Sequence, residues 1–128
     1  MPVRSLNSAI LKWPDKQKVL NEARLWAGLT GRGDENIVKI FCFGSICTSK
    51  WGVGSDIDIL IILKQTTVPF ISRAMIFDAS SISVPADILV YTQSEIATLS
   101  KEKGRFLDEI RKNSILLYRQ RLPKDKGD

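Results

Sequence analysis

The sequence predicts a small α/β domain with a mixed sheet of about four strands and flanking helices. Apolar residues first recur at helical spacing, and short runs rich in Ile, Val and Phe then alternate with polar or helical stretches. One run, 59–63, is continuously apolar, which is typical of a strand covered on both faces and therefore central in its sheet. At 128 residues, the chain has the length of one domain with its own core.

The helices are predicted from capping residues and from spacing. The first opens at Trp13-Pro14-Asp15 and stops at Gly31 and Gly33, because proline suits a first turn and glycine ends helices. A second opens at Pro69, and the capping-box pattern Thr92-Gln93-Ser94-Glu95 opens a third. The residues expected to face inward are Val19, Ala23, Trp26 and Ala27 in the first helix and Ile96 and Leu99 in the third. In the second helix, Phe70, Ala74 and Phe77 lie on one side.

The strands are predicted at 36–43, 56–63, 84–91 and 114–118. A break at Gly104 followed by a resumed apolar period predicts a further helical stretch before the last strand. We expect one domain over 1–118 and a basic, disordered tail over 119–128.

The absence of histidine excludes several classes of enzyme. Without it there is no Ser-His-Asp or Cys-His nucleophile, and no histidine-dependent zinc protease or ribonuclease. The two cysteines, Cys42 and Cys47, cannot complete a zinc site, and we expect buried thiols. Catalysis therefore depends on carboxylates, lysines, hydroxyls, a bound metal or the backbone.

Charge and hydropathy indicate the compartment and the kind of ligand. No signal peptide or membrane-spanning run is recognisable, so we expect a soluble, cytoplasmic protein. The plainer interpretation of the net charge of +5 is a solvated basic surface with a basic tail, and the functional one is attraction to an anionic ligand, either nucleotide phosphate or RNA. Aromatic residues do not interleave with the basic ones, so nucleic-acid binding is only weakly supported.

Three aspartates are predicted to meet at one end of the sheet. Asp56 and Asp58 are two residues apart on one strand and therefore project to the same face. Asp87 lies in the next apolar run, and pairing of the two strands would place it beside them. Carboxylates at about 4 Å repel one another by on the order of 4 kcal/mol at an effective dielectric of 20, so such a group calls for cations. Oxygen ligands suit Mg²⁺ or Mn²⁺, and two such ions serve in-line attack at phosphorus.

A Gly-Ser turn supplies the other half of the pattern. Gly44 ends a strand and lets a phosphate approach the backbone, while Ser45 offers an amide and a hydroxyl. Lys50 lies between this turn and the aspartates, where its charge suits a triphosphate. The candidate nucleotide-binding residues are Gly44, Ser45, Lys50 and Ser55. Each feature alone has a plainer interpretation, since Asp-x-Asp pairs arise by chance and Gly-Ser often marks only a turn.

In combination, these residues resemble a known family. Gly44-Ser45, ten residues and then Asp56-x-Asp58 are similar to the motif of the DNA polymerase β-like nucleotidyltransferase superfamily, and the length and Asp87 resemble its minimal nucleotidyltransferase branch. The resemblance implies a nucleoside triphosphate substrate, for which we expect ATP. It also implies Mg²⁺ held by Asp56, Asp58 and Asp87. It also implies transfer of a nucleoside monophosphate to a hydroxyl, with Gly44 and Ser45 on the β and γ phosphates and Asp87 also helping to activate the acceptor.

The sequence departs from the family at one place. Many members carry arginines just after Gly-Ser, whereas residues 46–49 here are Ile-Cys-Thr-Ser. The resemblance further implies a small helical HEPN-domain partner, with this chain as the antitoxin. The main alternative is a binding module that neutralises a partner by occlusion. A third, a fragment of an RNA- or antibiotic-modifying transferase, requires an acceptor domain that these residues do not predict.

Overall fold

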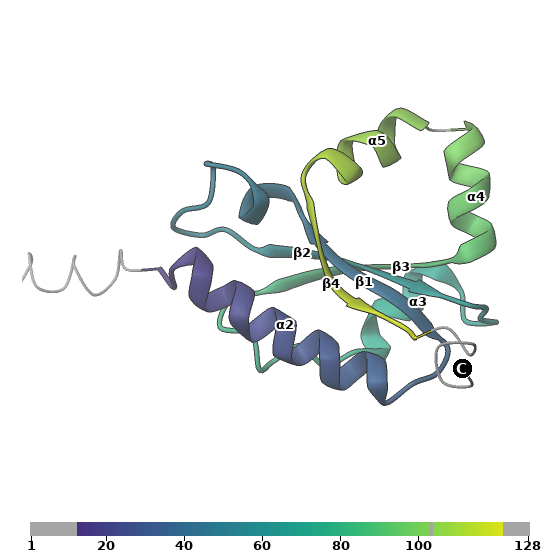
Figure 1. The fold of residues 1–128 in the computed structure, drawn as a ribbon, viewed down its shortest axis with the longest axis horizontal. Coiled ribbons are helices and arrows are strands. Elements are labelled where there is room, and N and C mark those ends of the chain that lie inside the picture. Colours follow the sequence, from purple (N-terminus) through teal and green to yellow (C-terminus); the bar gives the residue numbers. More distant parts are fainter. Residues whose placement is uncertain (1–12, 103, 122–128) are drawn as a thin grey trace, which may run out of the picture.

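A four-stranded mixed sheet forms the centre of the fold (Figure 1). The computed structural model describes residues 13–102 and 104–121. The strands lie in the order β3-β2-β1-β4, with β1 antiparallel to β2 and β4 and with β2 parallel to β3. Their bounds are β1 (Ile37–Phe43), β2 (Ile57–Leu63), β3 (Ala86–Thr92) and β4 (Ser114–Arg119). The predicted fold class is confirmed, and β2 is an inner strand, as its continuous apolar run predicts.

Helix α2 (Lys16–Arg32) covers one face of the sheet. Asp15 caps it by accepting a hydrogen bond from the backbone N–H of Gln17, which satisfies one of the free donors of the first turn. All four residues predicted to face inward are buried. Gly31 lies inside the helix instead of ending it. A glycine is needed at this position because the ring of Tyr118 occupies the space that a β-carbon would take.

The segment after β2 differs from its prediction. In place of a second full helix, α3 (Phe70–Arg73) makes one turn and η2 (Ala74–Ile76) another, and an irregular stretch leads to β3. Pro69 provides no side-chain cap, and Ile82 and Val84 are buried in the same core cluster as α2. Burial of these two residues draws the chain back across the face that α2 covers, so a longer helix does not form.

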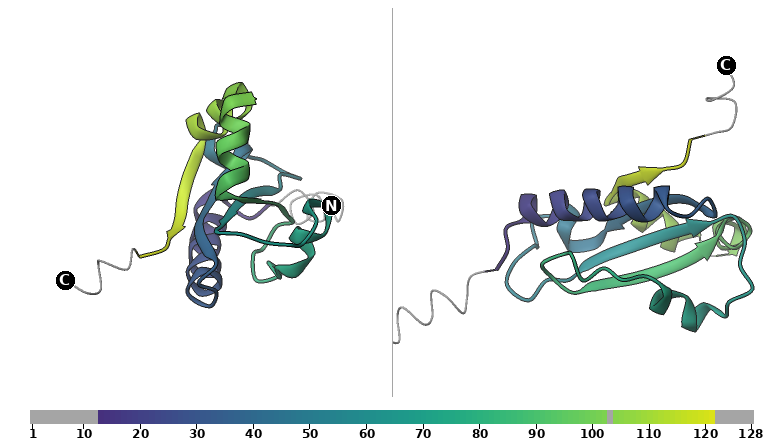
Figure 2. Two further views of the ribbon diagram at one scale, coloured as in Figure 1. Left: turned by 90° about the vertical axis from the view of Figure 1, so that its right-hand side faces the viewer. Right: turned by 90° about the horizontal axis from the view of Figure 1, so that it is seen from below.

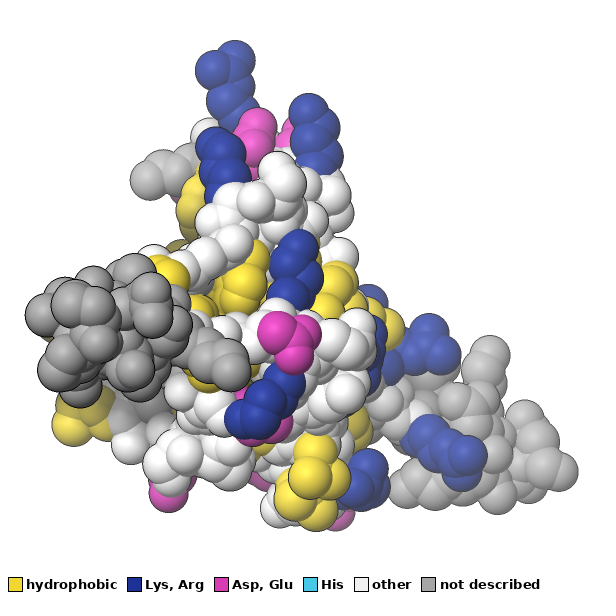
Figure 3. Space-filling view, turned by 90° about the vertical axis from the view of Figure 1, so that its left-hand side faces the viewer, with side chains coloured by type: hydrophobic (Ala, Val, Ile, Leu, Met, Phe, Trp, Pro, Cys, Tyr) yellow, Lys and Arg dark blue, Asp and Glu magenta, His cyan; other side chains and the backbone are white. Residues whose placement is uncertain are grey.

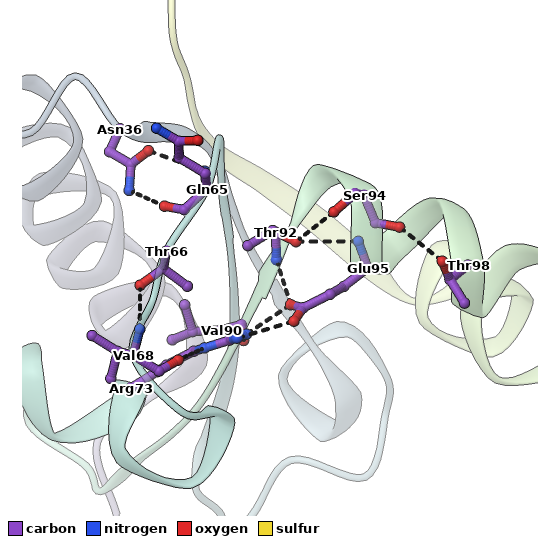
Figure 4. Close-up of polar contacts among 10 residues, drawn as sticks. All are labelled: Asn36, Gln65, Thr66, Val68, Arg73, Val90, Thr92, Ser94, Glu95 and Thr98. Atoms are coloured by element: carbon purple, nitrogen blue, oxygen red, sulfur yellow. Dashed lines mark hydrogen bonds and ion pairs between the residues drawn. The ribbon is translucent and has the colours of Figure 1, made fainter.

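Helices α4 (Gln93–Glu102) and α5 (Gly104–Lys112) stand on the opposite side of the sheet (Figures 1 and 2). The predicted capping box is confirmed: Thr92 N–H donates to Glu95 Oε1 at 2.8 Å, and Glu95 N–H donates to Thr92 Oγ1 at 3.1 Å (Figure 4). Ile96 and Leu99, the residues of α4 predicted to face inward, are only half-buried. The reason is that this helix rises from the end of β3 and does not lie across the sheet. Leu107 and Ile110 of α5 are buried.

Glu95 also anchors α3 through an ion pair with Arg73. Its carboxylate accepts two hydrogen bonds from the buried guanidinium of Arg73, at 2.7 and 3.0 Å (Figure 4). Arg73 donates further to the carbonyls of Val68 and Val90. This network ties α3, β3 and α4 together.

The last strand corrects the predicted start of the tail. Arg119 belongs to β4 and pairs with Lys39, and Gln120 N–H donates to Val38 O at 2.8 Å. The tail therefore does not begin at 119. Residues 122–128 lie outside the described residues.

The main core lies between the sheet and α2. The side chains on this face that are fully buried include Ile37, Ile40, Cys42, Ile57, Ile59 and Ile61. Cys42 and Cys47 are free thiols, as predicted, but only Cys42 is buried, whereas Cys47 is half-buried. Within the described part of the chain, no helix has the length and apolar character needed to cross a membrane.

Candidate functional site

The structure brings the predicted aspartates to one end of the sheet. Asp58 of β2 and Asp87 of β3 are direct partners in the parallel register, so they share a face on strands about 4.8 Å apart. Asp56 stands two residues before Asp58, just ahead of β2. Ile57 between them is fully buried on the α2 side. The alternation predicted from sequence is therefore correct.

The three carboxylates influence one another. Burial raises the pKa of Asp58, and the negative charges of Asp87 and Asp56 raise it further. Asp58 is half-buried, whereas Asp56 and Asp87 are exposed. Ionised Asp58 is therefore disfavoured by its surroundings, and a cation bound among these groups would relieve both causes.

Gly44 and Asp58, fourteen positions apart in the chain, lie in contact. Gly44 has φ +81°, a left-handed conformation that glycine adopts without strain. A β-carbon at this position would lie 2.3 Å from Asp58 Oδ2. The two halves of the motif thus form one site, because the missing side chain of Gly44 leaves room for the carboxylate.

Ser45 lies in the turn that follows. The 3-10 helix η1 (Gly44–Cys47) begins directly after β1. Ser45 O accepts hydrogen bonds from Thr48 N–H and Oγ1, at 3.0 and 3.1 Å. Within residues 13–102 and 104–121, the Ser45 hydroxyl makes no hydrogen bond, and the residue is only half-buried. Its hydroxyl is available to a ligand.

The other two predicted nucleotide-binding residues lie in the loop between η1 and β2. Ser55 Oγ accepts from Gly52 N–H at 3.0 Å, so this hydroxyl shapes the loop just ahead of Asp56. Lys50 is exposed, and its backbone N–H donates to Thr48 Oγ1. The structure gives the Lys50 side chain no contact with the aspartates among the described residues.

Lys16 is a residue of the site that sequence reasoning missed. It is the first residue of α2, and its Nζ donates to Thr48 O at 2.7 Å, which places a cation against the end of η1. The two residues are 32 positions apart, and nothing local in the sequence indicates the contact. It follows only from the way α2 packs on the sheet.

Metal ligands and a cavity complete the description. Among the residues that the structure describes, no group of three or more His, Cys, Asp or Glu side chains is gathered closely enough to hold a metal ion. The aspartates are thus neighbours without being a ready coordination shell. Asp87 also lines a cavity of about 530 Å³ at the β3 edge, whose wall includes Phe77, Ile82 and Pro85.

Comparison with known proteins decides the family. The polymerase beta nucleotidyltransferase family matches residues 30–121, which contain every candidate site residue named from the sequence. The chain belongs to this family. The matched residues run from the end of α2 through β4, and the suggested activity is that of a transferase.

A solved structure shows the same fold. A Sulfolobus solfataricus protein, provisionally described as a nucleotidyltransferase and solved at 1.40 Å, superposes with a TM-score of 0.59 at 20% identity. The match covers 82% of this nucleotidyltransferase and 84% of that chain. No curated protein sequence matches.

One face of the molecule shows no concentration of basic charge around a single site. On the side shown in Figure 3, lysine and arginine side chains are scattered, with acidic and hydrophobic side chains between them. This distribution gives that face no continuous basic stripe of the kind that tracks a nucleic-acid backbone.

Proposed function

We propose that this nucleotidyltransferase moves a nucleoside monophosphate, AMP from ATP, onto an acceptor hydroxyl. The observation that carries the proposal is the contact between the Gly44 turn and Asp58, with Asp87 beside Asp58 in register. This arrangement sets the backbone of the Gly44 turn directly against the Asp58 carboxylate. A phosphate bound at the Gly44 turn and cations bound at the aspartates would then lie next to each other.

The donor set fits a hard divalent cation. Asp56, Asp58 and Asp87 offer only carboxylate oxygens, and the raised pKa of Asp58 marks an excess of negative charge. These residues would hold Mg²⁺ or Mn²⁺, which would offset the phosphate charge and favour ionisation of the attacking hydroxyl. Gly44 and Ser45 would bind the β and γ phosphates.

The proposed reaction is a substitution at the α-phosphorus. The acceptor oxygen forms the new P–O bond, the bond to the β-phosphate breaks, and pyrophosphate leaves. Asp87, the more exposed of the paired carboxylates, would receive the hydroxyl proton. Asp56 and Asp58 would orient the phosphates through the bound cations.

The proposed acceptor is a hydroxyl on a partner protein, a small helical HEPN-domain toxin for which this chain is the antitoxin. The described residues are taken up by one sheet, its helices and the Gly-Ser loop. In-line transfer needs the acceptor oxygen held by an ordered surface, and a docked protein would provide it.

Intact-mass spectrometry of the partner tests this proposal. Incubation with ATP and Mg²⁺ should add about 329 Da per AMP transferred to a hydroxyl. Asp56→Asn and Asp58→Asn should remove the adduct, and Asp87→Asn should remove turnover while sparing much of the nucleotide binding. Asp108→Asn, an exposed aspartate on α5, is the matched control and should be fully active.

The competing function is neutralisation of the partner by occlusion. Residues 46–49 supply no cation after Gly-Ser, which favours this alternative. It predicts a tight complex that is unchanged by Asp56→Asn or Asp58→Asn and an unmodified partner. A neutralised partner without an adduct would therefore overturn the proposed transfer.

A further inference from the structure

A basic groove lies between the C-terminal half of α2 and β4. Its volume is about 740 Å³, and its floor includes Gly28, Gly31, Leu117 and Tyr118. The charged residues that line it are Arg24, Arg32, Lys64, Arg119 and Arg121, with Glu35 as the single acid. This basic groove is distinct from the aspartate site.

The cations of the basic groove are not neutralised within the described chain. All five are exposed, and none of them takes part in the ion pairs found among residues 13–102 and 104–121. Five cations against one acid leave an excess of positive charge around a single hollow. An anionic occupant would offset their mutual repulsion.

Strand β4, whose residues Leu117, Tyr118 and Arg119 line the basic groove, is an edge strand of the sheet. β4 ends the strand order and pairs only with β1. Among the described residues, no backbone group pairs with its outer side. At the opposite edge, by contrast, Arg73 already donates to Val90 O of β3. The backbone donors and acceptors of β4 are therefore a template for another extended chain.

We propose that the basic groove binds an extended acidic segment of a partner protein, which adds a strand to β4. Strand addition satisfies the backbone edge, and the arginines pair with the carboxylates of the added segment. A nucleic acid would match the charge but has no peptide groups for the edge. A second copy of this chain would bring the same excess of positive charge to this edge, which opposes self-pairing.

The basic groove lies far from the aspartates. Lys64 comes six residues after Asp58 along β2, about 20 Å at the rise of a strand. A segment docked on β4 would leave the aspartate end open while raising the local concentration of the rest of its protein. Only this delivery of an acceptor rests on the proposed function, because the docking itself needs no catalysis.

Fluorescence anisotropy with defined probes tests the inference. The probe is a labelled ten-residue peptide of alternating glutamate and threonine. A second version carries N-methyl groups on alternate backbone nitrogens, and oligouridylate of equal charge replaces the peptide in a third measurement. The proteins are the full chain, the pair Arg24→Glu/Arg119→Glu, and the control pair Arg105→Glu/Lys112→Glu, which reverses two exposed charges on α5.

The expected result has three parts. The full chain and the control pair bind the acidic peptide alike, the groove pair binds it at least about ten-fold more weakly, and N-methylation causes a comparable loss. Asp58→Asn should leave this binding unchanged, so failure of nucleotidyl transfer and failure of docking are distinguishable.

Several results would overturn the inference. Absence of peptide binding, or binding that is indifferent to N-methylation, would show that the edge of β4 is not used. Tighter binding of oligouridylate than of the peptide would assign the basic groove to nucleic acid. Sedimentation of the full chain as a dimer that the groove pair abolishes would assign it to a second copy.

Discussion

Replacing Gly44 by alanine tests the contact that joins the two halves of the site. Two separate costs are expected. An alanine at φ +81° adopts a left-handed conformation that costs about 1–2 kcal/mol. Its β-carbon would also lie 2.3 Å from Asp58 Oδ2, well inside the ordinary contact range that begins at 3.4 Å. The carboxylate or the turn must therefore move.

Gly54 separates these two costs. It has φ +85°, and a β-carbon there would meet nothing within 4 Å. Gly54→Ala should cost about 1 kcal/mol, since the strain is partly offset by the lower chain entropy of the unfolded alanine variant. Gly44→Ala should cost about 2–4 kcal/mol, because displacing a packed group adds about 1–3 kcal/mol.

Urea denaturation of both variants, followed by circular dichroism, provides the measurement. Introducing Gly44→Ala into an Asp58→Ala background completes a double-mutant cycle. In that background the cost of Gly44→Ala should fall to that of Gly54→Ala. Equal costs for the two glycine variants in the parent chain would refute the contact. An undiminished cost in the Asp58→Ala background would assign the loss to the backbone alone.

Three further predictions follow from the ionisable groups. Asp58→Asn should abolish transfer yet stabilise the metal-free fold at neutral pH, because it removes a repelled charge from a site whose pKa is raised; a destabilised variant in thermal melts would contradict this. The Arg73 guanidinium lowers the pKa of Glu95 to about 2. The contribution of this ion pair to folding stability should therefore be complete above about pH 4.5 and lost as the pH falls toward 2. A Glu95→Gln variant with the same acid unfolding curve as the parent chain would exclude this contribution. Burial raises the pKa of Cys42 to about 12, so this thiol should react with a disulfide reagent at pH 8 only on unfolding; labelling mapped to Cys42, and not to the half-buried Cys47, in the native chain would disprove it.

Local patterns predicted most of the fold because its elements carry their own signals. The capping box at Thr92 and Glu95 fixes the start of α4, and the unbroken apolar run of β2 identifies an inner strand. The stretch after Pro69 was predicted wrongly because periodicity does not report long-range anchoring. Burial of Ile82 against α2, far along the chain, decides its shape.

The site was predictable in part for the same reason. Side-chain alternation at the start of β2 predicts that Asp56 and Asp58 share a face. Pairing with the next apolar strand predicts that Asp87 lies beside them. The contact between Gly44 and Asp58 depends on the antiparallel return of the chain, and the sequence contains no measure of that approach. The strand edge at β4 is likewise set by topology, which no single segment encodes.

The source of positive charge for a triphosphate illustrates this limit. A loop that follows Gly-Ser without arginine suggests a weak phosphate site when the motif is considered alone. In the fold, Lys16 reaches the same loop from α2 and holds its Nζ against Thr48 O, at the end of the turn that begins with Gly44. An ammonium group fixed to a backbone carbonyl has two donors left, and an approaching phosphate could accept from them. Lys18, two residues further along α2, cannot substitute for it, because its Nζ donates to Glu22 and Ser83. We therefore expect Lys16, which lies ahead of the matched region 30–121, to supply the positive charge that the motif lacks, so the loss of arginine after Gly-Ser does not by itself indicate an inactive site.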